Sequence, residues 1–249
     1  MVRREVLQHH AKSTINGLLR VLGLRLERHD WGPRGWSNTL GRMRAAGFDP
    51  ELVLDVGAAQ GTWTEDCLQI LPAAQYHLFE PVQHASVHLK RLCAAHDNVH
   101  LHAAAVGSSD GTIKINANGD QSSIYSSHEH RGEAIDVPLR RLETALAEVS
   151  PKSRIFLKAD VQGYEIEVVR GAGKLLPAIE AILLEVSIRK IYDNIPLAHD
   201  IIAVMGSLDY RIFDICNYSQ RPLDRELAQA DIMFVRSNSG LFAKEAWGS

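Results

Sequence analysis

The sequence contains few cysteines and no cysteine motif. Only three of its 249 residues are Cys, at positions 67, 93 and 216, and none of them forms a C-x-x-C pair. This pattern argues against a disulfide framework and against a cysteine-bound zinc site. We therefore expect a protein of the reducing cytoplasm.

Long apolar runs are also missing. The most apolar part of the N-terminal region, Leu18 to Leu26, is interrupted by Arg20 and Arg25, and no small-residue cleavage site follows it. Such a segment is too short and too charged to span a bilayer. Two interpretations remain: a basic amphipathic helix on a membrane surface, or an ordinary amphipathic helix packed on its own domain or on a partner subunit. We favour the second, which disfavours membrane contact and makes a homodimer reasonable.

An excess of positive charge is absent as well. The chain has 27 Lys and Arg against 30 Asp and Glu, for a net charge of −3. Proteins that bind nucleic acid through its phosphates usually carry a basic stripe or a high pI. We expect no nucleic-acid partner.

The length and the 45% apolar content suit one α/β domain with small additions. From residue 50 onward, apolar strand patterns alternate with helical patterns, which predicts a mostly parallel sheet with helices on both faces. Turn residues between 217 and 224 favour a hairpin, so we expect the last strand to be antiparallel. The expected strands are 52–56, 76–80, 99–105, 134–139, 154–160, 180–187, 210–215 and 230–236.

We divide the chain into a helical extension (1–49), a main domain (50–240) and a C-terminal tail (241–249). All motifs described below lie beyond residue 50, so we expect a chain that begins near residue 45 to keep them functional. The polar stretch 116–132 is the one long loop of the pattern, and loops of that length in compact domains are often functional.

The strongest local signal is a strand, a turn and a helix start in one run. An apolar strand ends at Asp55-Val56-Gly57, and Gly61-Thr62 follows four residues after the first Gly. Glycines at such a turn let backbone N–H groups approach a ligand closely. A dinucleotide-binding turn normally has three glycines, which this one lacks. The pattern is similar to the first motif of S-adenosylmethionine (AdoMet) methyltransferases. We predict cofactor contacts at Asp55, Gly57, Ala58, Gly61 and Thr62.

A second signal lies about 20 residues further on. The expected strand 76–80 ends in Glu80, and Pro81 follows where a helix could begin. An acid at this place in an α/β nucleotide site binds the ribose hydroxyls, because a carboxylate accepts two hydrogen bonds from a diol. The alternative is a helix-capping Glu. We place Glu80 and Pro81 at the cofactor.

The segment from Lys158 to Ala172 carries the most specific motif. It reads Lys158-Ala-Asp160-Val-Gln162-Gly163, continues with Glu165 and ends at Gly171-Ala172. This resembles the hallmark K-x-D-V-E-G-x-E…G-A of the FkbM family of AdoMet-dependent methyltransferases. Supporting pieces in the same order are Leu54–Gly57, Phe79–Pro81, Ala104–Gly107, Gly119–Ser123, Val137–Leu139 and Leu184-Glu185.

The resemblance implies a Rossmann-like AdoMet methyltransferase fold: a mostly parallel seven-stranded sheet with an antiparallel edge strand, preceded here by the N-terminal helical segment. It implies AdoMet as cofactor and a hydroxyl of a sugar or natural-product small molecule as methyl acceptor. The matching segments add Ala105, Val106, Ser122 and Ser123 to the expected cofactor residues. The two serines are equally compatible with simple turn positions.

Methyl transfer to oxygen needs an aligned hydroxyl, a proton acceptor and exclusion of water. Asp160 ends an expected strand, at the edge where open α/β sheets bind ligands. It can orient the cofactor or the acceptor, and it can also cap the next helix. Gln162 replaces the usual acid of the motif, so the carboxylate chemistry must come from Asp160, Glu165 or Glu185. We take these three as the catalytic candidates and expect Glu at position 162 to be tolerated if it faces the site.

Other functions stay open at this point. Mg²⁺ is a second candidate cofactor, because a hard cation prefers carboxylate oxygens and would acidify a sugar diol. A nicotinamide-dependent oxidoreductase shares the strand–turn–acid layout but lacks the third Gly. A non-catalytic scaffold with an AdoMet-type fold is the remaining alternative. Lys158 either pairs with a carboxylate or lies at the core edge.

Overall fold

The structure is a computed structural model that describes residues 35–82, 86–117 and 133–242. The predicted helix within residues 1–28, most of the 116–132 loop, and Ser122 and Ser123 lie outside the described residues.

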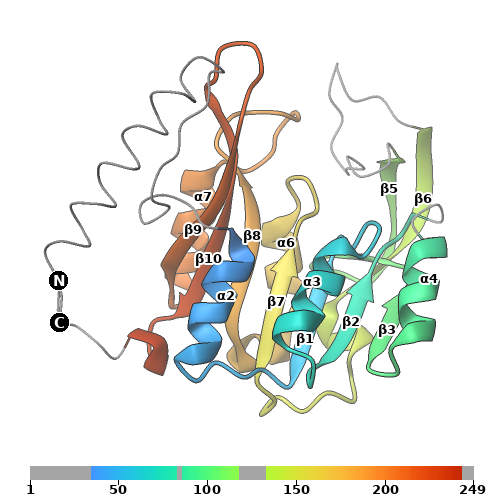
Figure 1. The fold of residues 1–249 in the computed structure, drawn as a ribbon. Coiled ribbons are helices and arrows are strands. Elements are labelled where there is room, and N and C mark those ends of the chain that lie inside the picture. The colour runs from blue at the N-terminus through green and yellow to red at the C-terminus, as the bar shows by residue number, and fades with distance from the viewer. Residues whose placement is uncertain (1–34, 83–85, 118–132, 243–249) are drawn as a thin grey trace, which may run out of the picture. The chain divides into compact units, whose positions relative to one another are not determined.

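The described residues form a seven-stranded sheet in the order β3-β2-β1-β7-β8-β10-β9 (Figure 1). Neighbours from β3 to β8 are parallel, whereas β10 is antiparallel to both β8 and β9. This confirms the α/β class and the antiparallel last strand. The strands are β1 (Leu52–Val56), β2 (Gln75–Phe79), β3 (Val99–His102), β7 (Ile155–Ala159), β8 (Ile179–Ser187), β9 (Tyr210–Gln220) and β10 (Leu227–Arg236).

The place of the antiparallel strand differs from the expectation. It is one strand in from the edge, and β9 is the edge strand. The reason is the hairpin: β10 returns from β9 into the position beside β8, so the strand before it is left outside.

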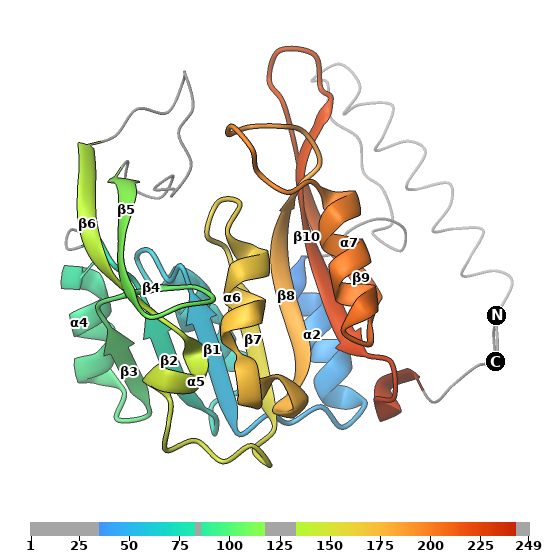
Figure 2. The ribbon, with the colours of Figure 1, turned by 180° about the vertical axis from the view of Figure 1, so that it is seen from behind.

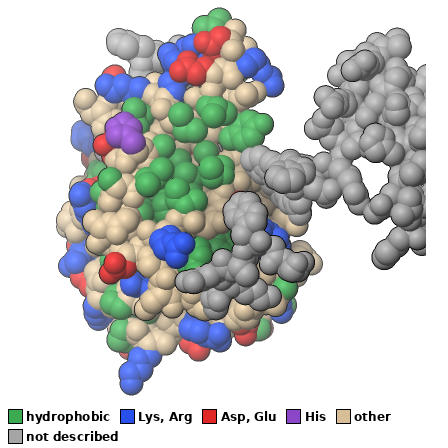
Figure 3. Space-filling view, turned by 90° about the vertical axis from the view of Figure 1, so that its left-hand side faces the viewer, with side chains coloured by type: hydrophobic (Ala, Val, Ile, Leu, Met, Phe, Trp, Pro, Cys, Tyr) green, Lys and Arg blue, Asp and Glu red, His purple; other side chains and the backbone are tan. Residues whose placement is uncertain are grey.

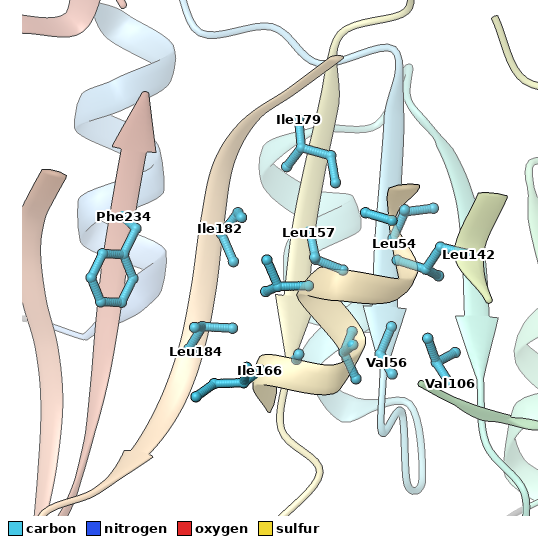
Figure 4. Packing of buried hydrophobic residues seen from close by; sticks show 14 of the residues in the cluster. Leu54, Val56, Val106, Leu142, Leu157, Ile166, Ile179, Ile182, Leu184 and Phe234 are labelled. Atoms are coloured by element: carbon cyan, nitrogen blue, oxygen red, sulfur yellow. The ribbon is translucent and has the colours of Figure 1, made fainter. Parts of the chain in front are cut away.

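Both faces of the sheet are covered by helices, as is usual for a parallel sheet. All five residues of β1 and all five of β7 are buried. One face packs against α2 (Trp36–Ala45), α3 (Thr62–Ile70) and α4 (Ser86–Ala95). The other packs against α5 (Leu142–Ala145), α6 (Glu165–Gly171) and α7 (Ala198–Ser207), which Figure 2 shows from behind. Figure 4 shows the apolar side chains under α6. Two 3₁₀ helices, η1 (Gly173–Ala178) and η2 (Gly240–Phe242), complete the described elements.

A small second sheet has the order β4-β6-β5. Its strands are β4 (Ala105–Val106), β5 (Gly111–Ala117) and β6 (Glu133–Arg140). The expected strand 134–139 belongs to this sheet, and β5 was missed by the sequence reading. The signal for β5 was present, because Ile113 and Ile115 alternate with polar residues. Ile115 packs with Val82 and Val137.

Helix α2 belongs to the covering of the main sheet. Its Leu40 and Met43 side chains are fully buried, and Thr39 Oγ1 donates to Asp214 of β9 over 2.6 Å. The Gly35 N–H bonds the Cys216 carbonyl over 2.8 Å. The domain boundaries at 49/50 and 240/241 stay predictions, but a chain that begins at residue 45 would lose these contacts.

The side of the molecule formed by β9 and α7 exposes apolar side chains. Ile202, Ile212, Ile215 and Tyr218 are each 38–48% exposed, and Figure 3 shows apolar side chains gathered there. Within the described ranges, no helix is both long and apolar enough to cross a membrane.

Candidate active site

A cavity of about 260 Å³ lies where β1, β2 and β7 end. Its wall includes Gly57 after β1, Glu80 after β2 and Asp160 after β7. Val106 and Ile115 close it from the small sheet. The cavity thus lies at the carboxyl edge of the parallel strands, where the sequence placed the ligand.

Gly57 forms the turn that joins β1 to the cavity. Its N–H and that of Ala58 both donate to the Phe79 carbonyl of β2, over 3.0 and 3.2 Å. Its φ is +74°, and a Cβ added there would lie 1.9 Å from the Asp160 backbone oxygen. The sequence attributed this glycine to close approach of a ligand. The structure gives another reason, which is close approach of the end of β7.

Gly61 begins α3 with a φ of +84°. A Cβ there would meet the side chains of Leu89 and Leu92 of α4 at 2.9 and 3.0 Å. Close packing of α3 against α4 therefore explains why this position is a glycine. Thr62 lines the cavity, whereas the buried Ala58 and Gly61 are not among the lining residues.

Glu80 is anchored by two backbone amides. One carboxylate oxygen accepts the N–H of Ala59 over 2.9 Å and the other accepts the N–H of Val82 over 2.8 Å. Burial raises the pKa of this carboxyl, and the two amides oppose that rise. A carboxylate has about four acceptor positions, so roughly two remain for a ligand.

Asp55 and Lys158 lie beneath the turn. Asp55 is fully buried, with one oxygen 3.0 Å from the Lys158 ammonium and the other accepting the Thr64 hydroxyl over 2.6 Å. Lys158 also donates to the Gly57 carbonyl over 2.8 Å. Burial alone would lower the pKa of Lys158, but the surrounding carboxylates, Asp55 foremost, outweigh it and raise that pKa. The expected pairing of Lys158 with a carboxylate is confirmed, and the pair supports the turn from below.

Asp160 lies in a polar cluster with Gln162 and Glu185. The Gln162 amide nitrogen donates to Asp160 Oδ1 over 3.1 Å and to Glu185 Oε2 over 2.8 Å. Gln229 of β10 donates to the same Glu185 oxygen over 2.6 Å. Burial and the neighbouring Asp160 carboxylate raise the pKa of Glu185. Asp160 and Gln162 line the cavity, whereas Glu185 is not among the lining residues.

Glu165 is 1% exposed and organises the loop after β7. One of its oxygens accepts the N–H groups of Val161 and Gly163, each over 3.1 Å. Burial raises the pKa of Glu165 to about 7, although these amides act in the opposite direction. This geometry makes Glu165 a support of the loop, so a direct catalytic contact from it has no geometric support.

The structure thus gathers part of the predicted set. Some cavity residues were not predicted from the sequence. Most of them, such as Ala59, Phe79 and Val82, are sequence neighbours of predicted residues. For Ile115 the only sequence signal was the alternation of apolar and polar residues in β5. Three predicted cofactor residues, Asp55, Ala58 and Gly61, are buried and do not line the cavity. The predicted cofactor residues on the wall are Gly57, Thr62, Glu80, Pro81, Ala105, Val106 and Asp160.

Metal binding gains no support from the part of the chain that the structure describes. There, no group of three or more His, Cys, Asp or Glu side chains is arranged to hold an ion. Between Asp160 and Glu185, where the expected Mg²⁺ would need oxygen ligands, the Gln162 amide donates to both. His77 and His102 of β2 and β3 bond each other over 2.8 Å instead of surrounding a shared site.

Comparison with known proteins identifies the family of this chain. The family model described as the methyltransferase FkbM domain matches residues 55–212. A 2-O-methyltransferase, NoeI of Sinorhizobium fredii, is 29% identical over 163 residues, or 59% of this chain and 67% of that protein. The crystal structure of a methyltransferase FkbM from Methylobacillus flagellatus KT aligns with a TM-score of 0.49 and 15% identity, over 80% of this chain and about half (48%) of that one. Since the family model covers more than half of the chain, this protein belongs to the FkbM family and is an AdoMet-dependent methyltransferase.

Proposed function

We propose that the protein transfers the methyl group of AdoMet to a hydroxyl of a sugar or another natural-product small molecule. The observation that carries the proposal is the place of Asp160. Asp160 lines the cavity together with Gly57 and Glu80. The name of the similar NoeI, a 2-O-methyltransferase, supports oxygen as the accepting atom.

The cavity residues fit the cofactor. Glu80 retains acceptor positions that suit the two ribose hydroxyls. Phe79, Val82 and Ile115 offer an apolar wall for a flat base. AdoMet, when bound, supplies an electrophilic methyl group on its sulfonium.

Asp160 provides the proton acceptor and the orienting group in this proposal. A hydroxyl becomes a stronger nucleophile as its proton is withdrawn during attack, and a carboxylate within hydrogen-bond distance can accept that proton. Gln162 holds the Asp160 carboxyl by its Oδ1. The acceptor proton then passes from Asp160 to solvent after the methyl group has been transferred.

The remaining partner predictions follow from the same proposal. The acidic net charge gives no attraction to nucleic acid, so a small neutral acceptor fits better. A cytoplasmic location and a homodimer stay predictions. Family membership favours methyl transfer over the nicotinamide-dependent alternative and over a scaffold without activity.

Two experiments test the proposal in sequence. Calorimetry with AdoMet and with NAD measures cofactor choice, and we expect AdoMet to bind. Incubation with methyl-labelled AdoMet and a panel of sugars and hydroxylated natural products, followed by mass spectrometry, then identifies the acceptor. NAD binding without AdoMet binding would overturn the proposal.

A further inference from the structure

Position 162 carries an amide where the family motif has an acid, and the amide has a defined orientation. Its nitrogen faces the carboxylates of Asp160 and Glu185, at 3.1 and 2.8 Å. Its oxygen accepts the Tyr192 hydroxyl over 3.3 Å. The opposite orientation of the amide would not pair with Asp160, Glu185 and Tyr192 in this way, because the amide oxygen cannot donate to the acids and the amide nitrogen cannot accept from the phenol.

The far side of the amide is anchored by buried groups. Tyr192 is 3% exposed, and Glu185 is held a second time by Gln229 over 2.6 Å. Gln162 itself has a φ of +55°, directly before Gly163 with a φ of +105°. Backbone and side chain are therefore both fixed. The ionisable groups that face Glu185 include three carboxyls, those of Asp160 after β7, Glu165 of α6 and Asp231 of β10. Lys158 of β7 and Tyr192 face it as well.

A glutamate at position 162 could not make the same contacts. It has no N–H to donate, and it would place a third carboxyl beside Asp160 and Glu185. Its negative charge would lie about as close to the Asp160 carboxylate as the amide nitrogen does now, and like charges at such a distance repel strongly in a half-buried site. The amide removes this repulsion and links the two acids.

We propose that Gln162 is a positioning residue, which Glu185 and Tyr192 anchor and which holds the Asp160 carboxyl toward the cavity. The inference rests on the proposed role of Asp160 in methyl transfer. In this chain the second acid of the cluster is Glu185 on β8, and the side chain at the motif position links it to Asp160. Glu185 acts through Gln162 and does not contact the reacting atoms.

An exchange of the two side chains separates positioning from structural support. In the double variant Gln162→Glu/Glu185→Gln, one amide and one carboxyl again face each other, so their mutual hydrogen bond can re-form. Asp160 nevertheless loses the donor at position 162, because the side chain there is now a carboxyl group. We expect the double variant to recover most of the melting temperature that each single variant loses, while turnover stays about 10²-fold below wild type at little change in acceptor KM.

NMR measurement of hydrogen exchange tests the anchoring of Gln162 without the need for a methyl acceptor. In the complex with S-adenosylhomocysteine, the side-chain amide protons of Gln162 should exchange with water much more slowly than those of exposed Gln69. Gln162→Ala assigns the signal, and Glu185→Gln and Tyr192→Phe should each weaken its protection. Fast exchange in the wild-type protein, or full protection in Glu185→Gln, would overturn the inference. So would a double variant that regains wild-type turnover along with stability. AdoMet binding in the wild-type protein is measured separately, so loss of the proposed function itself is recognised independently.

Discussion

The backbone oxygen of Asp160 lies 1.9 Å from the point that a Cβ on Gly57 would occupy. The ends of β1 and β7 are therefore in contact at the cavity, and the first motif and the hallmark motif of the family meet there. Lys158 reinforces the contact from below through the Gly57 carbonyl. Cofactor turn and proposed catalytic acid are thus parts of one rigid junction.

Gly57→Ala tests this junction. The Cβ would push against the Asp160 carbonyl, and a φ of +74° costs a non-glycine residue about 1–2 kcal/mol by itself. We expect a loss of at least about 3 kcal/mol in urea unfolding, together with weaker AdoMet binding. Gly41→Ala in α2 is the matched control, since nothing lies within 4 Å of its added Cβ; it should be neutral or slightly stabilising. Equal stability of the two variants would contradict the close contact.

Glu80→Gln tests the ribose assignment. Glu80→Ala would also release the Ala59 and Val82 amides, so the amide variant is the sharper change. It keeps the size of the side chain and one acceptor oxygen, so one of the two backbone amides stays paired, but it loses the charge-assisted bonds. AdoMet affinity measured by calorimetry should fall by about 1.5–3 kcal/mol. Glu65→Gln, on the exposed face of α3, serves as control and should bind like wild type; unchanged affinity in Glu80→Gln removes this residue from the cofactor site.

Lys158→Met tests the buried ion pair. It leaves the fully buried Asp55 without its cation, which typically costs about 3–5 kcal/mol. Asp55→Asn combined with Lys158→Met should recover part of the loss. Arg170→Met, which breaks a surface pair with Glu167, should cost less than about 1 kcal/mol in the same urea titrations. A similar cost for the buried and the surface pair would show that the junction does not depend on Lys158.

The histidines of β2 and β3 predict an acid-sensitive stability. Burial, together with His102 and His100, lowers the pKa of His77 to about 4. The unfolded chain then binds more protons between about pH 6.5 and 4, so stability is complete above this window and falls as the pH drops through it. For a half-exposed ring we expect His77 to account for about 1 kcal/mol. Urea unfolding at pH 7 and pH 5 should show a smaller difference for His77→Phe than for wild type or for the exposed-site variant His88→Phe. An unchanged difference in His77→Phe would contradict the prediction.

Much of this fold follows from local sequence signals. The strands that lead to Gly57, Glu80 and Asp160 are short, mostly apolar runs that end in Gly or acid, and such runs predict both the strands and the sheet edge. What local signals cannot give is which strands become neighbours. The insertion of β10 beside β8 and the pairing of β5 with β6 depend on contacts between distant segments. For the same reason α2 was assigned to an extension, although its Leu40 and Met43 complete the core.

The candidate site shows the same limit. Glu80 and Asp160 were correctly placed at strand ends, but their motif neighbours have different tasks. Asp55 and Glu165 are turned inward to Lys158 and to backbone amides, which no spacing rule reveals. The expected tolerance of Gln162→Glu is revised, because the amide at this position donates to two carboxylates.

Transfer of a ¹³C-labelled methyl group from AdoMet tests the central claim most directly. The product carbon is observed by NMR, whose chemical shift distinguishes a methyl on oxygen from one on nitrogen or carbon, in wild-type protein and in Asp160→Asn. We predict an O-methyl product, AdoMet affinity that is largely kept in Asp160→Asn, and turnover that falls on the order of 10²-fold or more. A methyl group on nitrogen or carbon, or near-normal turnover in Asp160→Asn, would contradict the account.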